Sequence, residues 1–228
     1  MTFGKGDFIK IEYNLWRIAD EKLVRTTDKK LAQDNDIFSE SARYEPQLIV
    51  IEKDSALKAL WDAVKAMDVG QSKKIELEPK DAFGERNTDL VRVMPIADFR
   101  KKDIEPEPGM QIDIEGVIAT VKSVNSGRVM VDANNPLAGE KIRYEIKVVG
   151  KVTKDDEKIR SVALSYGLVP EKTEVREGIA TLVFGPETKI NAGYFVNKSY
   201  TIAAILEYMD AVKKVIVQEE YSRPEKKD

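Results

Sequence analysis

The side chains that most often carry proton and metal chemistry in enzymes are missing from this chain. Its 228 residues include no histidine and no cysteine. This excludes a Ser-His-Asp triad, a thiolate nucleophile, a histidine-bound metal and a disulfide framework. Catalysis would have to use carboxylates, lysines, hydroxyls, a carboxylate-bound cation or no side-chain proton transfer at all. No glycine-rich phosphate-binding motif is present, whereas a serine–lysine dyad stays open because its members need not be neighbours in sequence.

Two turn-rich segments keep apolar side chains where a solvated loop would be polar. The first is residues 78–86, with the sequence EPKDAFGER, and the second is residues 131–139, with the sequence VDANNPLAG. Phe83 and Leu137 are their large apolar members. Loops held by a rigid scaffold often carry function. On local physics alone, however, these side chains predict plugs that close the ends of a barrel.

Hydrophobic periodicity predicts the elements that must position these loops. Apolar and polar residues alternate along residues 8–16, which predicts a half-buried strand. Its apolar face carries Ile9, Ile11, Tyr13 and Leu15. Residues 56–64 have apolar side chains at helical spacing, so we expect a helix there, capped by Asp54 or Ser55.

The rest of the chain divides into a β-rich block and a mixed block. Residues 86–130 contain short strand patterns and the hairpin signal Asn125-Ser126-Gly127, which predicts an all-β unit. The charged residues 154–158 predict a linker. Beyond them, a strand over 174–184, a helix capped by Asn197 or Ser199 and a strand over 212–217 predict an α+β unit.

Composition limits the partners that the protein could have. The 37 basic and 40 acidic residues nearly balance, which gives no reason to expect nucleic acid or an anionic membrane as a partner. There is no apolar run of roughly 18 residues and no apolar run behind the first charges, so we expect a cytoplasmic protein without a membrane span. The charge-rich composition also favours a protein from a hot environment.

The two turn-rich segments resemble the P-x-D-A-[YF]-G and D-x-N-[HN]-P-L-A-G signatures of FKBP-type peptidyl-prolyl isomerases, in their long SlyD-like archaeal form. The first signature matches residues 79–84, and the second matches residues 132–139. The resemblance extends over residues 5–153 and includes Thr26-Thr27-Asp28 and Pro108-Gly109-Met110. Two such loops in this order form a stronger signal than either alone.

The resemblance implies an α+β architecture in three parts. Residues 1–85 and 131–153 would form an FKBP antiparallel half-barrel wrapped on one helix. Residues 86–130 would form the insert-in-flap domain, which binds unfolded chains in SlyD-like proteins. Residues 154–228 resemble in position the extra C-terminal domain of longer archaeal members, which is associated with dimerisation, so a homodimer through this part is expected.

The resemblance also implies a pocket for the proline of a polypeptide substrate. Its walls would be Tyr13, Val24, Leu57, Leu60, Phe83, Leu137 and Tyr144, with Arg25, Tyr44 and Asn135 at the rim. Leu57 would also offer its backbone N–H to the substrate carbonyl, because the first N–H groups of a helix lack internal partners.

Four residues depart from the pattern of the family. Arg25 stands where most members have an acidic residue, Ala59 where glycine is usual, Phe83 where tyrosine is commoner, and Asn135 where histidine is usual. Because a buried unpaired cation is costly, we expect Arg25 to pair with a carboxylate or to point into solvent. Asn134 and Asn135 can still tie their loop by amide hydrogen bonds.

Two functions are compatible with these residues. The first is a peptidyl-prolyl cis-trans isomerase that acts on unfolded or nascent proline-containing polypeptides and captures them with its inserted domain. The alternative is a holdase chaperone with a weakened or inactive pocket, which the four departures favour. Rotation about an X-Pro bond breaks no covalent bond and moves no proton, so no cofactor or metal is implied.

Overall fold

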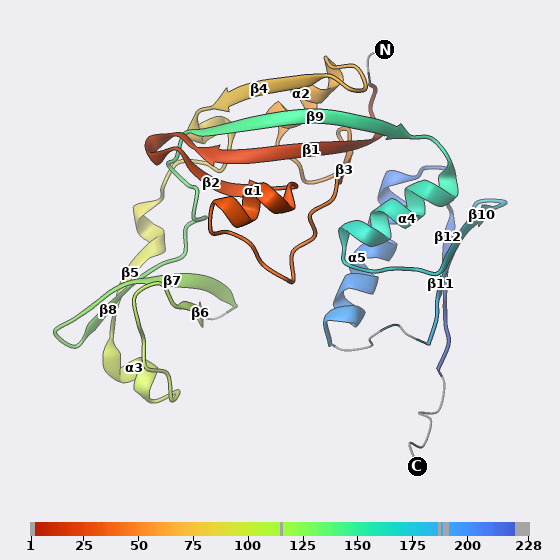
Figure 1. Ribbon diagram of the computed structural model, residues 1–228. Coiled ribbons are helices and arrows are strands. Elements are labelled where there is room, and N and C mark those ends of the chain that lie inside the picture. The colour runs from red at the N-terminus through yellow and green to blue at the C-terminus, as the bar shows by residue number, and fades with distance from the viewer. Residues whose placement is uncertain (1–2, 115, 187, 189–191, 222–228) are drawn as a thin grey trace. The chain divides into compact units, whose positions relative to one another are not determined.

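The computed structural model describes residues 3–114, 116–186, 188 and 192–221 (Figure 1). Contacts between residues divide the chain into two compact units. Unit 1 contains residues 1–16, 21–76 and 143–228, and unit 2 contains residues 17–20 and 77–142. Each unit has a hydrophobic core of its own, so each is described by itself.

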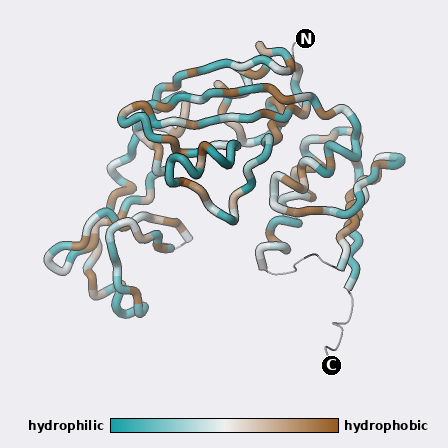
Figure 2. The backbone as a smooth tube through the Cα atoms, in the orientation of Figure 1, coloured by the Kyte–Doolittle hydropathy of each residue, from teal (hydrophilic) through white to brown (hydrophobic). Residues whose placement is uncertain are grey.

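A five-stranded sheet forms the base of unit 1. Its order is β2 (Lys22–Thr26), β1 (Phe8–Arg17), β9 (Ile142–Val152) and β4 (Ser72–Leu77), and β3 (Gln47–Val50) pairs antiparallel with β1. The predicted strand over 8–16 is confirmed by β1, which buries Ile9, Ile11, Tyr13 and Leu15. On β9 the buried residues are Ile142, Tyr144, Ile146, Val148 and Val152. Figure 2 shows hydrophobic and hydrophilic stretches alternating along these strands.

The helix α2 (Lys58–Lys65) confirms the helix predicted after β3, but the predicted cap is wrong. Its N-cap is Leu57, and no side chain caps it. The Asp54 carboxylate instead accepts hydrogen bonds from the backbone N–H of Val50 (2.6 Å) and Ala56 (3.0 Å) and from the Trp61 indole (2.8 Å). Asp54 therefore fixes the connection between β3 and α2 rather than the helix end.

Residues 154–158 begin a helix, so the prediction of a linker there is wrong. Helix α4 (Asp155–Ser165) carries three acidic residues in its first turn, where the helix dipole favours negative charge. Ile159, Val162 and Ala163 follow at helical spacing and are buried. The charged cluster is thus the start of an amphipathic helix whose apolar face packs inward.

The remaining C-terminal residues form a three-stranded sheet and one long helix. The predicted single strand over 174–184 is wrong, because β10 (Lys172–Arg176) and β11 (Ile179–Phe184) form an antiparallel hairpin. β12 (Lys214–Glu219) pairs parallel with β11. Helix α5 (Ala192–Tyr208) starts before Asn197 and Ser199, so neither residue caps it as predicted. Within the described ranges, no helix is long and apolar enough to cross a membrane.

One core joins the C-terminal residues to the N-terminal strands of unit 1. Phe8 of β1 and Val50 of β3 are buried in the same cluster as Ile159, Leu182 and Phe184. This core extends across the predicted boundary at residue 154, so the segments on either side stabilise each other. The division into three functional domains stays a prediction.

Lys53 is expected to stabilise the packing of the C-terminal residues against the N-terminal strands of unit 1. Its ammonium donates to the carbonyls of Glu207 (3.1 Å) and Tyr208 (3.4 Å) at the end of α5 and pairs with Asp210 at 2.6 Å. Hydrogen bonds to charged groups contribute about 1.5–3 kcal/mol, so Lys53→Met should lower the free energy of unfolding by about that amount. Urea denaturation checks this. Lys65→Met is the control, because the Lys65 side chain is more exposed (31%) than that of Lys53 (13%), and an equal loss in both variants would contradict the assignment.

A four-stranded antiparallel sheet forms the base of unit 2. Its order is β5 (Val91–Pro95), β8 (Arg128–Asp132), β7 (Val117–Asn125) and β6 (Gln111–Ile114). The predicted hairpin is confirmed, with Ser126 (φ 47°) and Gly127 (φ 76°) in its turn. The predicted all-β character of residues 86–130 is wrong, because helix α3 (Ile96–Arg100) places Phe99 in the core of this unit.

Candidate active site

Two buried tyrosines face each other in the unit 1 sheet. Tyr13 of β1 is 8% exposed and Tyr144 of β9 is 7% exposed. Their ring centroids are 5.7 Å apart, and the ring planes are tilted by 55°. Tilted aromatic pairs contribute about 0.5–1.5 kcal/mol beyond the area that they bury. The structure therefore brings together two residues that the family resemblance assigns to the pocket wall.

The segment after β2 holds the backbone of Tyr13. The Tyr13 N–H donates to Thr27 Oγ1 (2.9 Å), and the Thr27 N–H donates to the Tyr13 carbonyl (3.0 Å). Thr26 Oγ1 accepts from the Asp28 N–H (2.9 Å), and the Asp28 carboxylate caps the short helix α1 (Lys29–Asp34). The motif Thr26-Thr27-Asp28 thus ties the edge strand, the central strand and a helix together.

Burial raises the pKa of both tyrosine hydroxyls. For Tyr13, burial raises the pKa, and the nearby Arg25 guanidinium opposes that effect only in part. For Tyr144, burial and then the proximity of Tyr13 raise the pKa to about 12, although Arg25 again acts in the opposite direction. Both side chains are therefore neutral near pH 7, and they present a wall without charge.

Tyr144 is expected to lose its proton late in an alkaline titration. Its pKa is about 12 in the folded protein and near 10.0 in the unfolded chain. The stabilisation linked to this proton is complete below pH 10.0 and is lost as the pH rises toward 12. The ¹³Cζ chemical shift of Tyr144, assigned by its absence from Tyr144→Phe, should have its midpoint near the higher value. A midpoint near 10.0 would show that the ring is hydrated.

Arg25 lies at the edge of the tyrosine wall. It is exposed on β2, as one of the two expected arrangements requires, and its guanidinium interacts with the Tyr13 hydroxyl. Within the described part of the chain it pairs with no carboxylate. The exposed cation therefore stays hydrated, which avoids the cost of burying an unpaired charge.

Three further predicted wall residues of unit 1 come from β2 and α2. Leu60 is buried, whereas Val24 and Leu57 are half-buried. The Leu57 N–H donates to no acceptor among the described residues, and its bond to a substrate carbonyl stays a prediction. Ala59 is half-buried in the first turn, where alanine supports a helix better than glycine does.

Tyr44 makes its contacts within its own loop. Its ring stacks on Phe38 with centroids 5.6 Å apart and planes at 16°, and its hydroxyl accepts from the Ser39 N–H (2.9 Å). These contacts stabilise the loop that leads to β3. The place of Tyr44 at the pocket rim stays a prediction.

Phe83 and Leu137 belong to unit 2, where the two turn-rich segments meet. Phe83 is half-buried and Leu137 is 8% exposed. The Gly139 N–H donates to the Gly84 carbonyl (2.8 Å). Gly139 has φ 79°, and a Cβ at this position would lie 3.3 Å from the Cβ of Arg86. Glycine therefore permits both the turn and the close approach of the two segments.

Asp132 is the buried centre of this junction. It is 4% exposed and accepts hydrogen bonds from the backbone and side-chain amides of Asn134 (3.0 and 2.7 Å). Arg86 pairs with it at 2.5 Å, and Lys122 lies at 3.8 Å. Burial acts to raise the pKa of Asp132, but the Asn134 hydrogen bonds and the two cations lower it overall. Asn134 also exchanges two hydrogen bonds with the Asn87 backbone, each of 2.8 Å.

Asn135 is exposed and ties its own turn. Its Oδ1 accepts from the Leu137 N–H (2.9 Å), and its carbonyl accepts from the Ala138 N–H (2.9 Å). The expectation that amide hydrogen bonds tie this loop is confirmed. The turn therefore does not require the histidine that is usual at this position. The Asn135 side-chain oxygen accepts a backbone hydrogen bond from two residues further on, as in an Asx-turn.

The predicted wall residues thus fall into two groups. Tyr13, Val24, Leu57, Leu60 and Tyr144 belong to unit 1, whereas Phe83 and Leu137 belong to unit 2. That the two groups act on one substrate stays a prediction. Sequence reasoning missed the supporting roles of Thr27, Arg86 and Asp132. The signal for Asp132 was available, since it is an acidic residue between an apolar strand and an apolar loop.

Comparisons with known proteins identify relatives of this chain. A family model described as the IF domain of FKBP26 matches residues 92–137. The FKBP-type isomerase SlyD of Helicobacter pylori is 29% identical over 51% of this chain and 64% of that protein. The FKBP-type 16 kDa isomerase of Escherichia coli is 28% identical over 52% and 84%. Among solved structures, the N-terminal domain of FKBP42 from Arabidopsis thaliana matches with a TM-score of 0.35 and 14% identity, over 67% of this chain and 77% of that one.

A further relative comes from an archaeon. The short-type peptidyl-prolyl cis-trans isomerase of Methanocaldococcus jannaschii is 31% identical over 144 residues. The match covers 63% of this chain and 90% of that protein, so nearly the whole relative is represented here. Similarity at this level over nearly a complete relative establishes that the chain belongs to the FKBP-type peptidyl-prolyl isomerase family.

Proposed function

We propose that this protein is a peptidyl-prolyl cis-trans isomerase that accelerates X-Pro bond rotation in unfolded or partly folded polypeptides. The observation that carries this proposal is the buried Tyr13–Tyr144 pair in a chain whose relatives are named isomerases. Neither ring has a group that is charged near pH 7, which suits a reaction that transfers no proton. The substrates would be exposed, proline-containing segments.

The mechanism is differential binding by an apolar surface. The barrier to X-Pro rotation, about 18–20 kcal/mol, is mainly the amide resonance that is lost when the bond twists. The planar amide separates more charge than the twisted one, so water stabilises the planar ground state more. Replacing that water with aromatic and aliphatic side chains favours the twisted state. The free N–H of Leu57 would hold the substrate carbonyl and fix its orientation.

An assay with a short proline peptide separates the isomerase from the holdase alternative. NMR exchange spectroscopy measures the interconversion rate without a coupling protease. We expect added protein to raise the rate, and Phe83→Ala should reduce the effect while suppression of client aggregation is retained. A rate equal to that in buffer, together with undiminished suppression of aggregation, would support the holdase and refute the isomerase.

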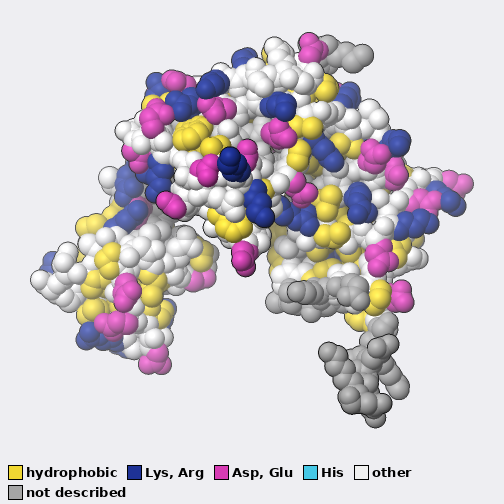
Figure 3. Space-filling view, viewed as in Figure 1, with side chains coloured by type: hydrophobic (Ala, Val, Ile, Leu, Met, Phe, Trp, Pro, Cys, Tyr) yellow, Lys and Arg dark blue, Asp and Glu magenta, His cyan; other side chains and the backbone are white. Residues whose placement is uncertain are grey.

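We also propose that the unit 2 sheet captures clients. Its β5 and β8 strands place Val93 (57% exposed) opposite Met130 (39% exposed) on the face away from the core. Val117 and Ile118 of β7 are also more than half exposed. Figure 3 shows hydrophobic side chains gathered on the surface of this part of the chain. Neighbouring exposed apolar side chains of this kind typically mark a surface that binds other proteins.

Removing this sheet is expected to weaken client capture while short peptides are still turned over. Val91 and Asp132 are directly paired across β5 and β8, so an Asn-Gly turn can replace residues 92–131 without spanning a gap. The double variant Val93→Gln, Met130→Gln tests the same face without a deletion. Equal loss of peptide turnover and aggregation suppression in both variants would contradict separate sites.

We further propose a homodimer through α5. Phe195, Val196, Tyr200 and Leu206 are each 44–58% exposed on this helix. Burying such side chains against a second copy would remove apolar area from water. Sedimentation velocity should report a dimer that Tyr200→Glu dissociates, and a monomer in the unmodified protein would refute the proposal.

A further inference from the structure

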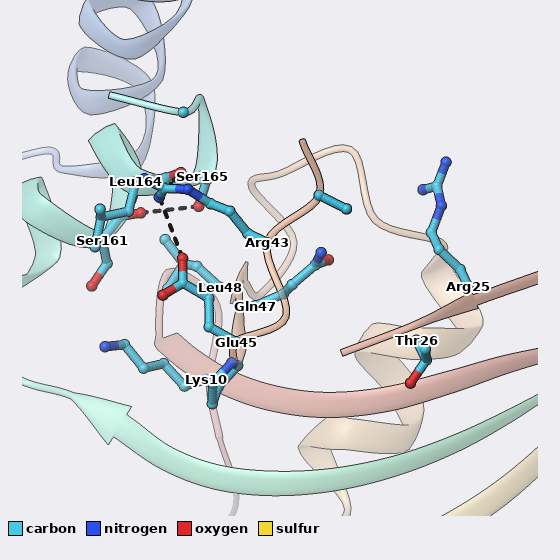
Figure 4. Close-up of a pocket in the computed structure, with 13 residues that line it drawn as sticks. Lys10, Arg25, Thr26, Arg43, Glu45, Gln47, Leu48, Ser161, Leu164 and Ser165 are labelled. Carbon is cyan, nitrogen blue, oxygen red and sulfur yellow. Dashed lines mark hydrogen bonds and ion pairs between the residues drawn. The ribbon is translucent and has the colours of Figure 1, made fainter. Parts of the chain in front are cut away.

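A cavity of about 500 Å³ lies within unit 1. The end of β2, the loop before β3 and the C-terminal half of α4 surround it (Figure 4). Three basic side chains line it, Lys10, Arg25 and Arg43, against one acidic side chain, Glu45. The cavity therefore carries an excess of positive charge in a protein whose net charge is negative.

Arg43 is already neutralised and serves as part of the wall. Its guanidinium pairs with Glu45 at 3.3 Å and donates to the Leu164 carbonyl (3.1 Å) near the C-terminus of α4. Figure 4 shows both interactions inside the cavity. A cation at a helix C-terminus is also favoured by the helix dipole. These bonds fix Arg43, so the unpaired charge in the cavity comes from other residues.

Lys10 and Arg25 supply that unpaired charge. Neither forms an ion pair with a carboxylate in the ranges that the structure describes. Arg25 is exposed, so pairing it with an incoming anion costs little desolvation. The remaining lining offers apolar contacts from Leu48 and Leu164 and the hydroxyls of two serines, Ser161 and Ser165. Such a lining suits a side chain with an apolar stem and an anionic end.

Arg25 connects this cavity to the tyrosine wall. It lines the cavity, and it lies close enough to Tyr13 to act on the pKa of that hydroxyl. A polypeptide whose proline lies against Tyr13 would therefore bring its flanking residues within reach of Arg25. The cavity and the wall are both in unit 1, so their relation does not depend on unit 2.

We propose that this cavity is a subsite for an acidic side chain that flanks the proline, and that Arg25 determines the preference for it. The inference rests on the proposed isomerase function and adds the substrate class, which is an acidic polypeptide segment. Guanidinium and carboxylate groups match in charge and in planar geometry, so they form strong charge-assisted hydrogen bonds. Because Arg25 is exposed, we expect a preference of about threefold to fivefold.

A set of matched peptides tests this preference. Glutamate is placed in turn at each of the two positions on either side of one proline, and each peptide is compared with its glutamine counterpart. NMR exchange gives kcat/KM for each pair. At one position at least, the glutamate peptide should be turned over threefold to fivefold faster, and the ratio should fall toward one in high salt. Ratios of one at all four positions would overturn the proposal.

Variants show whether Arg25 causes the preference. Arg25→Gln should bring the glutamate-to-glutamine ratio to one, and Arg25→Lys should retain part of it. Lys22→Gln is the matched control, because it removes another exposed cation from β2 outside the cavity. The proposal fails if Arg25→Gln keeps the full ratio or if Lys22→Gln abolishes it.

Binding separates this inference from the proposed activity. Chemical-shift titrations with the same peptides give Kd for each pair without requiring turnover. If no peptide is isomerised but glutamate still tightens binding in an Arg25-dependent way, the subsite stands and the isomerase proposal falls. If peptides are isomerised with no glutamate preference in Kd or kcat/KM, the isomerase stands and the subsite falls.

Discussion

Replacing Tyr144 with alanine is expected to lower kcat/KM for a proline peptide by at least about tenfold. The variant removes one ring of the Tyr13–Tyr144 pair and opens the wall to water. A tenfold loss corresponds to about 1.36 kcal/mol of transition-state stabilisation. Water that enters the site restores the hydration of the planar amide, which adds to the loss. The NMR exchange assay measures this effect directly.

Two controls distinguish a lost catalytic surface from a loss of folding. Truncating a buried aromatic side chain costs about 3–5 kcal/mol, so circular dichroism must first show that Tyr144→Ala is folded. Tyr144→Phe keeps the ring and should retain most activity. Tyr166→Ala removes a half-buried ring that stacks on Tyr200 instead. A folded Tyr144→Ala variant with unchanged kcat/KM would show that the tyrosine pair is a structural core only.

Replacing Asp132 with alanine is expected to lower the free energy of unfolding by about 3 kcal/mol or more. The carboxylate is buried and bonds to Asn134, while Arg86 pairs with it. Hydrogen bonds to charged groups contribute about 1.5–3 kcal/mol each, and Asp132→Ala removes the two that the half-buried Asn134 donates together with the ion pair to Arg86. The junction between the two turn-rich segments should therefore loosen. Thermal and urea denaturation measure the loss, and Asp113→Ala, at an exposed residue in the same sheet, is the control.

The contribution of Asp132 to the free energy of unfolding should also depend on pH. Its pKa is lowered from 3.8 in the folded protein, so the folded state binds this proton less readily than the unfolded chain does. The stabilisation is therefore complete above pH 3.8 and is lost as the pH falls through the folded pKa. Asp132→Ala should have a shallower loss of stability in acid than the unmodified protein. Parallel acid profiles would contradict the assignment.

Local patterns in the sequence predicted the elements that carry the site. The alternation around Tyr13 and the helical spacing around Leu60 depend only on neighbouring residues, and both became β1 and α2. The meeting of the two turn-rich segments at Gly84 and Gly139 fits the family signatures, although no local rule requires it. The contact between Tyr13 and Tyr144 likewise depends on strand pairing, which periodicity alone does not determine.

The incorrect predictions of a linker at residues 154–158 and of a cap by Asp54 have physical causes. Asp155, Asp156 and Glu157 are polar like a linker, but the helix dipole favours them in a first turn, and the apolar residues that follow decide the outcome. Asp54 has the chemistry of a helix cap, yet its carboxylate accepts from the Val50 and Ala56 N–H groups and the Trp61 indole instead. For Arg25 the sequence left two arrangements open, pairing with a carboxylate or pointing into solvent, and the structure shows the exposed one.

The central claim is that the apolar wall formed by Tyr13 and Tyr144 accelerates rotation about the X-Pro bond without a proton transfer. The most direct test is kcat/KM for one neutral proline peptide, measured by NMR exchange between about pH 5 and 9, in H₂O and in D₂O. The pKa of both wall tyrosines lies above 10.0, so we expect a flat profile and a solvent isotope effect close to one. A bell-shaped profile, or an isotope effect of about two or more, would show that a proton moves in the rate-limiting step and would contradict the account.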